Sequence, residues 1–315
     1  MFIRRISGNC ICMLFCCLLF ASCSQSALPA TIPTRTPARS ITHNPSPTPT
    51  RPSDATPARY SAHLILSGLY RPDDLAFDPA GHLVFSDVYR GTISRLNANG
   101  SVSVLLSGLA GPEGLVFLPN GTLIIAEQQT NRILALAPSS TSLTVLRILP
   151  GTPSRKPCKD GVDGIALDPT TQTLIIPDSP TGNVYRMSLD GKKLTLLATH
   201  IPRPVGAAVD PQGNVYVADE CGGALWKITP SGQTTRTGGF GMLDDIVIDR
   251  YGNLLVTDLK PSIHALIRVR MLTGKREILA RQGFIEPQGL VVDAHDNIFL
   301  SDDFVNKIVE YIPRR

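Results

Sequence analysis

Residues 112–127 read PEGLVFLPNGTLIIAE, and this stretch decides the fold because versions of it recur along the chain. Its apolar runs, Leu115–Phe117 and Thr122–Ala126, are separated by a turn rich in Pro, Asn and Gly, which is typical of an antiparallel β-hairpin. The other versions are PDDLAFDPAGHLVFSD from Pro72, VDGIALDPTTQTLIIPD from Val162, PVGAAVDPQGNVYVAD from Pro204, LDDIVIDRYGNLLVTD from Leu243 and PQGLVVDAHDNIFLSD from Pro287.

The spacing of the six copies predicts the architecture. They start 40, 50, 42, 39 and 44 residues apart, and units of about 40 residues that hold several short strands are the signature of propeller blades. A third strand is expected after each hairpin, as at Arg132–Leu136 and Ala224–Ile228. A fourth is expected before the next copy, as at Ser101–Leu106 and Lys193–Ala198. We therefore predict an all-β, six-bladed β-propeller over residues 60–315.

The two ends of this region are expected to meet in one blade. The last unit stops after its third strand, Lys307–Ile312, while the segment His63–Ser67 precedes the first repeat without a unit of its own. We predict that this N-terminal strand completes the last blade. The ring then has no open radial edge, which avoids the hazard of an unpaired strand.

The first 22 residues have the pattern of an export signal. Arg4 and Arg5 precede an apolar run, Ile11–Phe20, that is too short for a comfortable membrane span. The following residues, Phe20-Ala21-Ser22-Cys23, resemble a bacterial lipobox, so lipidation of Cys23 is expected. Ordinary signal cleavage and an uncleaved anchor are the alternatives. Lipidation predicts an extracytoplasmic protein that is anchored to the cell membrane.

Residues 23–59 are predicted to form a disordered tether, because Pro, Thr and Ser dominate and apolar content is too low for a core. Six arginines and one acid lie in residues 1–59, which leaves 24 of the 30 basic and 25 of the 26 acidic residues for the propeller. That near-balance argues against a nucleic-acid partner. We expect a monomer whose membrane contact is the lipid anchor.

Acidic residues that recur in every repeat are expected to be structural, since an asymmetric site would not need six copies. One set closes each second strand and is predicted to cap the following turn. Another set ends the first strand in five repeats and is predicted to organise its hairpin. The first set is Asp87, Glu127, Asp178, Asp219, Asp258 and Asp302, and the second is Asp78, Asp168, Asp210, Asp249 and Asp293.

Positions at the start of each first strand differ between repeats and are expected to face the central channel. They are Asp73, Glu113, Asp163, Val205, Asp244 and Gln288, and Asp74 and Asp245 add a further acid in two repeats. Converging carboxylates repel one another, so a divalent cation, shared protons, or water and distance must relieve the repulsion. Calcium suits such a site, because it takes about six to eight oxygen ligands in irregular geometry.

The repeat pattern resembles those of NHL-repeat proteins and of the regucalcin/gluconolactonase family, over all of residues 60–315. The family holds a catalytic calcium at the channel mouth through a Glu, two Asn and an Asp. The resemblance implies Glu113 as the Glu, Asp163 in place of an Asn, and Asp244 as an acid of a later blade, with Asp73 as a further metal candidate. Val205 departs from the pattern because it replaces a polar ligand.

The resemblance implies a calcium-dependent lactone or ester hydrolase, in which Asp244 or Asp245 activates water as the general base. Arg155, Lys156 and Lys159, in the longest insertion between repeats, are candidates for binding an anionic ligand, although a solvated loop explains them equally well. Arg203 and Gln288 complete the predicted substrate contacts.

Cys158 and Cys221 are the two cysteines of residues 60–315. They belong to segments expected on the same face of adjacent blades, so we predict a disulfide in an oxidising, exported setting.

Two alternatives to the hydrolase stay open. The first is a non-catalytic NHL-type module that binds a small molecule, glycan, peptide or cell-envelope partner at its mouth. The second is an activity like that of virginiamycin lyase, suggested by the AEQ stretch at residues 126–128 alone.

Overall fold

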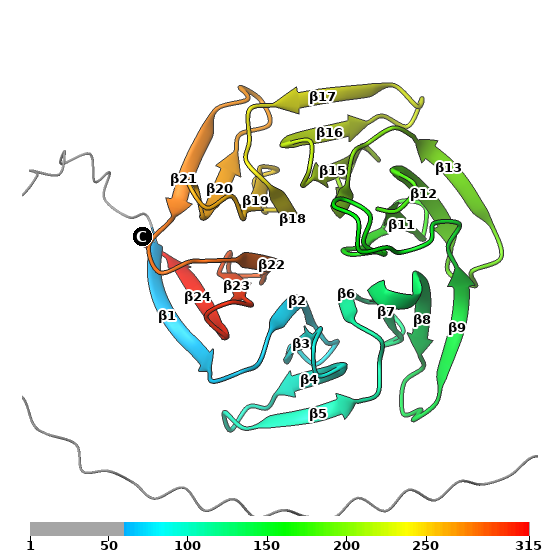
Figure 1. Ribbon diagram of the computed structural model, residues 1–315. Helices are drawn as coiled ribbons and strands as arrows, with labels where there is room; N and C mark the ends of the chain where they lie inside the picture. Colours follow the sequence, from blue (N-terminus) through cyan, green and yellow to red (C-terminus); the bar gives the residue numbers. More distant parts are fainter. Residues whose placement is uncertain (1–59, 315) are drawn as a thin grey trace, which may run out of the picture. The chain divides into compact units, whose positions relative to one another are not determined.

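The computed structural model describes residues 60–314 (Figure 1). The predicted signal peptide, Cys23, the tether and Arg315 lie outside the described residues. Within the described part, 24 strands and one short 3₁₀ helix, η1 (Gln128–Thr130), make up the regular structure. No helix of residues 60–314 combines the length and the apolar character that a membrane crossing requires.

The strands form six antiparallel four-stranded sheets, which confirms the predicted six-bladed propeller. Figure 1 shows the first strands of the blades around the centre and the fourth strands around the outside. Blades 1 to 3 are β2–β5 (Pro72–Phe77, Leu83–Asp87, Thr92–Leu96, Val102–Leu106), β6–β9 (Pro112–Phe117, Leu123–Glu127, Arg132–Leu136, Leu143–Ile148) and β10–β13 (Ala166–Asp168, Thr173–Asp178, Asn183–Ser188, Leu194–Ala198). Blades 4 to 6 are β14–β17 (Pro204–Val209, Val215–Asp219, Ala224–Ile228, Thr234–Gly238), β18–β21 (Leu243–Ile248, Leu254–Asp258, Ala265–Val269, Arg276–Ala280) and β22–β24 (Pro287–Val292, Ile298–Asp302, Lys307–Pro313) with β1 (Tyr60–Ser67).

The ring closes as predicted, because β1 is the outer strand of blade 6. It pairs with β24 in an antiparallel register that runs from Tyr60 opposite Pro313 to Ser67 opposite Lys307, with an irregularity between Leu64 and Leu66. The hydroxyl of Tyr60 also accepts a hydrogen bond from Arg268 of blade 5. The first strand of the described chain therefore fastens the last blade to both its own sheet and a neighbour.

Apolar side chains pack between the blades rather than in a single central core. Six clusters of buried residues lie in the described part, and each draws its members from two adjacent blades. The strands of one blade thus bury both faces against neighbours, so their apolar runs are nearly continuous. Leu123 to Glu127 of β7, for example, are all buried. Removal of this surface from water is the main stabilising term of the ring.

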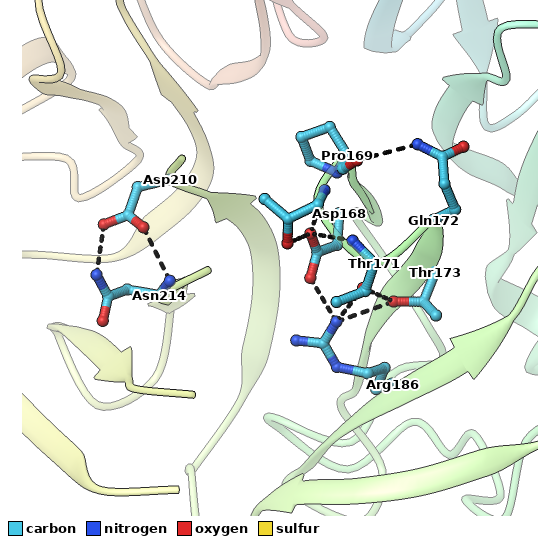
Figure 2. Close-up of polar contacts among 9 residues, drawn as sticks. Asp168, Pro169, Thr171, Gln172, Thr173, Arg186, Asp210 and Asn214 are labelled. Carbon is cyan, nitrogen blue, oxygen red and sulfur yellow. Dashed lines mark hydrogen bonds and ion pairs between the residues drawn. The ribbon is translucent and has the colours of Figure 1, made fainter. Parts of the chain in front are cut away.

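The acids at the ends of the first strands organise their hairpins, which confirms the predicted structural role. Figure 2 shows two forms of the arrangement. Asp210 accepts hydrogen bonds from the backbone and side-chain nitrogens of Asn214. Asp168 instead accepts from Thr170 and from the guanidinium of Arg186 on β12. In both hairpins, a carboxylate satisfies turn donors that would otherwise depend on water.

The acids that close the second strands fasten the segment entering the same blade. Asp258 accepts the backbone N–H groups of Gly241 and Met242, which precede β18. Asp219 does the same for Arg203 before β14 at 3.1 Å, and also caps its own turn through Gly222 at 2.8 Å. These recurrent acids are therefore part of the scaffold.

Blade 3 differs from the expected pattern. The repeat from Val162 predicts a first strand that starts there, whereas β10 covers only Ala166–Asp168. The segment before it packs closely against blade 2. The carbonyl of Asp163 accepts the N–H of Gly114 at 3.2 Å, and a Cβ on Gly161 would lie 1.7 Å from the carbonyl oxygen of Gln128. The longest insertion of the array leads into this tight approach.

Close approach of the first strands explains a glycine near the channel in four repeats. A Cβ on Gly206 would lie 2.6 Å from the carbonyl oxygen of Asp244 in the next blade and 2.8 Å from the Cα of Asp245. Gly114, Gly164 and Gly289 face backbone atoms of neighbouring blades at 2.4 to 3.0 Å in the same way. Contacts between the backbones of adjacent first strands therefore set the radius of the channel.

We expect Gly206→Ala to lower the free energy of unfolding by about 1 to 3 kcal/mol, because the added methyl has no flexible side chain to displace. Chemical denaturation of the purified protein measures the change. The exposed Thr235→Ala on β17 is the control and should stay within about 0.5 kcal/mol of the parent. An unchanged Gly206→Ala would show that the blades tolerate a wider channel.

Candidate functional site

A cavity of about 420 Å³ lies where the first strands and the loops of all six blades meet. Eight of its lining residues are acidic and two are arginines. The acids are Asp73, Glu113, Asp160, Asp163, Glu220, Asp244, Glu286 and Asp303, and the arginines are Arg71 and Arg203. A narrower space of about 10 Å³, lined partly by Asp73, Asp163 and Asp244, holds about one water molecule.

The structure brings the predicted channel residues together, with one exception. Asp73, Glu113, Asp163, Asp244 and Gln288 all line the cavity. Val205 does not, because its fully buried side chain packs in the apolar cluster between blades 4 and 5. The four carboxyl groups are themselves buried, and Glu113 Oε2 has no hydrogen-bond partner.

Burial and crowding favour the neutral form of three of these acids. Burial raises the pKa of Asp73, Glu113 and Asp244 well above the usual range, and the charge of Asp163 raises each further. Burial also raises the pKa of Asp163, but Arg203 and a hydrogen bond with Glu113 oppose that shift. Asp163 therefore holds negative charge most readily of the four, while its neighbours retain protons.

Arg203 is the principal counter-charge of the group. Its guanidinium Nη2 lies 3.3 Å from Asp160 and 3.4 Å from Asp163, and its Nη1 contacts Glu220. Burial lowers the pKa of Arg203, but the surrounding carboxylates outweigh burial and raise the pKa above its usual value. Arg203 was predicted to bind substrate, and the structure shows it bound to acids of the cavity wall.

A second ion-pair group forms the opposite wall. Arg71 donates from Nε to Asp303 at 2.7 Å and lies 3.5 Å from Glu286, while its guanidinium stacks over Tyr89 at 4.7 Å. Burial and a hydrogen bond with Asp303 raise the pKa of Glu286 to about 7. Asp303 Oδ1 is buried and has no partner, so this wall offers a free acceptor to a ligand.

Asp245, a predicted general base, has a structural position instead. Its Oδ1 accepts the N–H of Ile246 and its Oδ2 accepts that of Leu290 in the next blade, both at 2.7 Å. Asp74 fastens blade 1 to blade 2 in the same way through Leu115. Asp245 does not line the main cavity, and both of its oxygens are engaged. The geometry gives no support for a catalytic role, and Asp244 is the acid that faces the cavity.

The insertion before blade 3 contributes the acidic residue Asp160 to the cavity wall. The basic side chains that were predicted to bind a ligand do not line the cavity. Arg155 and Lys156 are exposed and do not line the cavity, and Lys159 donates to the carbonyl of Pro180 at 3.1 Å. Asp160 of the same loop does line it. Cys158 and Cys221 form a disulfide with their Cα atoms 6.0 Å apart, so this insertion is fastened to the loop that follows β15.

Oxygen donors of this kind suit calcium chemically, but their placement does not form a calcium site. Among residues 60–314, no three Asp, Glu, His or Cys side chains are placed to ligate one ion. Calcium requires about six to eight converging oxygens, whereas Arg203 already engages Asp160, Asp163 and Glu220. The residues present do not fit a bound calcium in this arrangement.

Half of the charged wall was missed from the sequence. Arg71, Asp160, Glu220, Glu286 and Asp303 lie in connecting segments, whereas the prediction took its acids from the first strands alone. A signal for two of them exists, because Glu220 and Asp303 directly follow the recurrent acids Asp219 and Asp302. The same position is Val88, Gln128 or Leu259 in three other repeats, and each of these also lines the cavity.

Comparisons with known proteins agree on the fold. The family model described as NHL repeat matches residues 202–228, which correspond to most of the hairpin and third strand of blade 4. No curated protein sequence matched the chain. Many solved structures share the architecture, and the chain therefore has an NHL-type repeat within a six-bladed propeller.

Three of the similar structures illustrate the range of proteins that share this fold. A gluconolactonase from Xanthomonas campestris is 17% identical, covers 82% of this chain and 92% of its own, and has a TM-score of 0.66. A calcium-binding regucalcin from Agrobacterium tumefaciens is 17% identical, with 81% and 96% covered and a TM-score of 0.64. A catalytically inactive histidine-to-alanine variant of virginiamycin B lyase from Staphylococcus aureus, solved with quinupristin, is 19% identical, with 76% and 80% covered and a TM-score of 0.60. Such low identities establish the fold alone.

The pH dependence of stability tests the charge state of the wall. Folding raises the pKa of Glu286 from about 4.3 in an unfolded chain to about 7. The stabilisation from its bound proton is complete below about pH 4 and is lost as pH rises through about 7. Asp73, Glu113 and Asp244 act in the same direction. We expect the thermal midpoint to fall between pH 5 and 8, and to fall less in Glu286→Gln.

Thermal unfolding followed by circular dichroism, at constant ionic strength, measures the slope of the thermal midpoint against pH. Asp190→Asn is the control, because that exposed carboxylate has a lowered pKa and does not titrate in this window. The control should keep the parent slope. A Glu286→Gln slope equal to the parent would mean that Glu286 is already ionised at pH 5.

Proposed function

We propose that this protein is a ligand-binding propeller that takes a small organic cation, carrying an amine or guanidine group, into its central cavity. The observation that supports this proposal is the imbalance of the cavity wall. Eight carboxyl groups face two arginines, and both arginines are already paired with acids. Even when Asp73, Glu113 and Asp244 hold their protons, five acids face the two arginines, and a cleft with such an excess of negative charge concentrates cations.

Two buried oxygens give the ligand a place to bind. Glu113 and Asp303 line the cavity, and each has a buried oxygen, Oε2 and Oδ1 respectively, without a hydrogen-bond partner. An ammonium offers three donors and a guanidinium five, with no acceptor among them. Such a ligand would satisfy both oxygens and neutralise part of the acidic wall. A sugar hydroxyl can donate to the same oxygens but brings no charge.

Titration calorimetry with matched ligands tests the proposal. Glucosamine and glucose differ in one amine, and spermidine and agmatine extend the cationic set. We expect the cations to bind and glucose to bind at least about tenfold more weakly, because it lacks the charge-assisted hydrogen bond. Glu113→Leu removes the unpaired acceptor and should weaken cation binding about tenfold or more, while Asp190→Asn, outside the cavity lining, should not. Equal binding of glucose and glucosamine, or no binding of any cation, would contradict the proposal.

The calcium-dependent lactone or ester hydrolase is the second candidate. It is supported by the fold shared with the gluconolactonase and the regucalcin and by the carboxyl groups at the channel mouth. The contacts of Arg203 count against it. Lactone hydrolysis that is abolished by a chelator and restored by calcium would favour this candidate over the cation-binding module.

The lyase hypothesis gains no support from the cavity. The related lyase is inactive when one histidine is replaced by alanine, and none of the five histidines between residues 60 and 314 lines this cavity. The export signal, lipidation at Cys23 and an extracytoplasmic location are proposed on the leader sequence alone. A disulfide in the propeller suits an oxidising compartment.

A further inference from the structure

Two backbone hydrogen bonds fix the position of Arg203, independently of the contacts of its side chain. Its N–H donates to Asp219, the acid that closes β15, at 3.1 Å, and its carbonyl accepts the N–H of Glu220 at 3.1 Å. The guanidinium is thereby directed into the cavity from the start of blade 4, where its side chain is only 13% exposed. Blade 4 is also the one whose channel position is apolar, at Val205.

The guanidinium faces acids of several blades at once. It contacts Asp163 of blade 3, Asp160 of the insertion before blade 3, and Glu220 of blade 4. Its charge also opposes the rise in the pKa values of Glu113 in blade 2 and Asp244 in blade 5. A metal ion at the channel mouth would face the same acids and have the same electrostatic role.

The disulfide connects the two loops that hold this guanidinium. Cys158 lies two residues before Asp160, and Cys221 lies one residue after Glu220. The insertion is also closed on itself by a hydrogen bond from the N–H of Ser154 to the carbonyl of Lys159 at 2.8 Å. Two carboxylates that contact Arg203 are thus fixed relative to each other across 63 residues of sequence.

We propose that Arg203 is the resident cation of the central cavity and takes the place of a divalent metal ion there. The disulfide-linked loops hold their acids on the guanidinium, so the oxygens are not free to converge on a metal. A guanidinium cannot lose its charge near neutral pH, which makes this neutralisation permanent. An organic cation still has acceptors, because it needs only the free oxygens of Glu113 and Asp303.

Removal of the guanidinium should convert the cavity into a cation site. Arg203→Met keeps most of the side-chain volume and leaves the acids without their counter-charge. Because a unit charge within about 4 Å strongly opposes a second cation, we expect calcium affinity to rise at least about tenfold in this variant. Calorimetric titration of the full-length protein with calcium chloride, at constant ionic strength, measures the change.

The control variants distinguish the effect of removing the positive charge from the effect of disturbing the folded structure. Arg203→Lys retains the positive charge and should bind calcium no better than the parent. Arg203→Gln repeats the experiment if the methionine variant does not fold, as judged by its circular dichroism. The paired change Cys158→Ser and Cys221→Ser frees the two loops and should give an intermediate gain.

One result would overturn the proposal. It is a folded Arg203→Met or Arg203→Gln variant that binds calcium no more tightly than the parent protein. The proposal does not depend on the organic ligand, since the parent protein can fail to bind any amine and Arg203 can still exclude calcium. Failure of the amine panel and failure of the calcium titration are therefore separate outcomes.

Discussion

The structure depends on how closely the first strands approach the axis. Glycines such as Gly206 let backbone pack on backbone, and the residues beside them then have little room to avoid one another. In this propeller four of the six side chains at the start of the first strands are carboxylic acids, and burial raises their pKa values. Close packing and charge are thus coupled, because a tighter ring leaves the channel less hydrated and its carboxyl groups more fully protonated.

The molecule relieves this crowding in several ways at different depths. Asp74 and Asp245 direct carboxyl oxygens to backbone N–H groups of the next blade, so these acids form part of the contacts between blades. Nearer the mouth, Asp163 is paired with Arg203, and Asp303 is paired with Arg71. Among the acceptors of the wall, the buried oxygens Glu113 Oε2 and Asp303 Oδ1 still have no hydrogen-bond partner.

Features with a local cause could be predicted from the sequence. The six blades, the closing strand and the structural acids follow from repeats and turn chemistry, which act over a few residues. Asp73, Glu113, Asp163 and Asp244 could be placed at the channel because each occupies the same position in its repeat. The role of Asp245 could not, because its two acceptor bonds depend on how close blade 6 comes to blade 5.

The ion pairs of Arg71 and Arg203 could not be predicted from the sequence for a similar reason. Arg71 and Glu286 each directly precede a repeat, at a position whose residue type varies between repeats, and Asp160 lies in an insertion without a repeat pattern, so only the fold shows which of them meet at the cavity. The same reasoning limits what the fold neighbours say about activity. A shared ring fixes where a site lies, whereas the side chains from irregular loops decide what the site binds.

The closure of blade 6 has a mechanical consequence. Tyr60 lies opposite Pro313, so the two ends of the propeller leave the β1–β24 pair at the same end. Tension between the ends would open that pair one rung at a time, as a zipper opens, instead of shearing all its hydrogen bonds together. The ring is thus most easily opened by force at its seam, on the outer rim, while the inner strands that surround the cavity are loaded last.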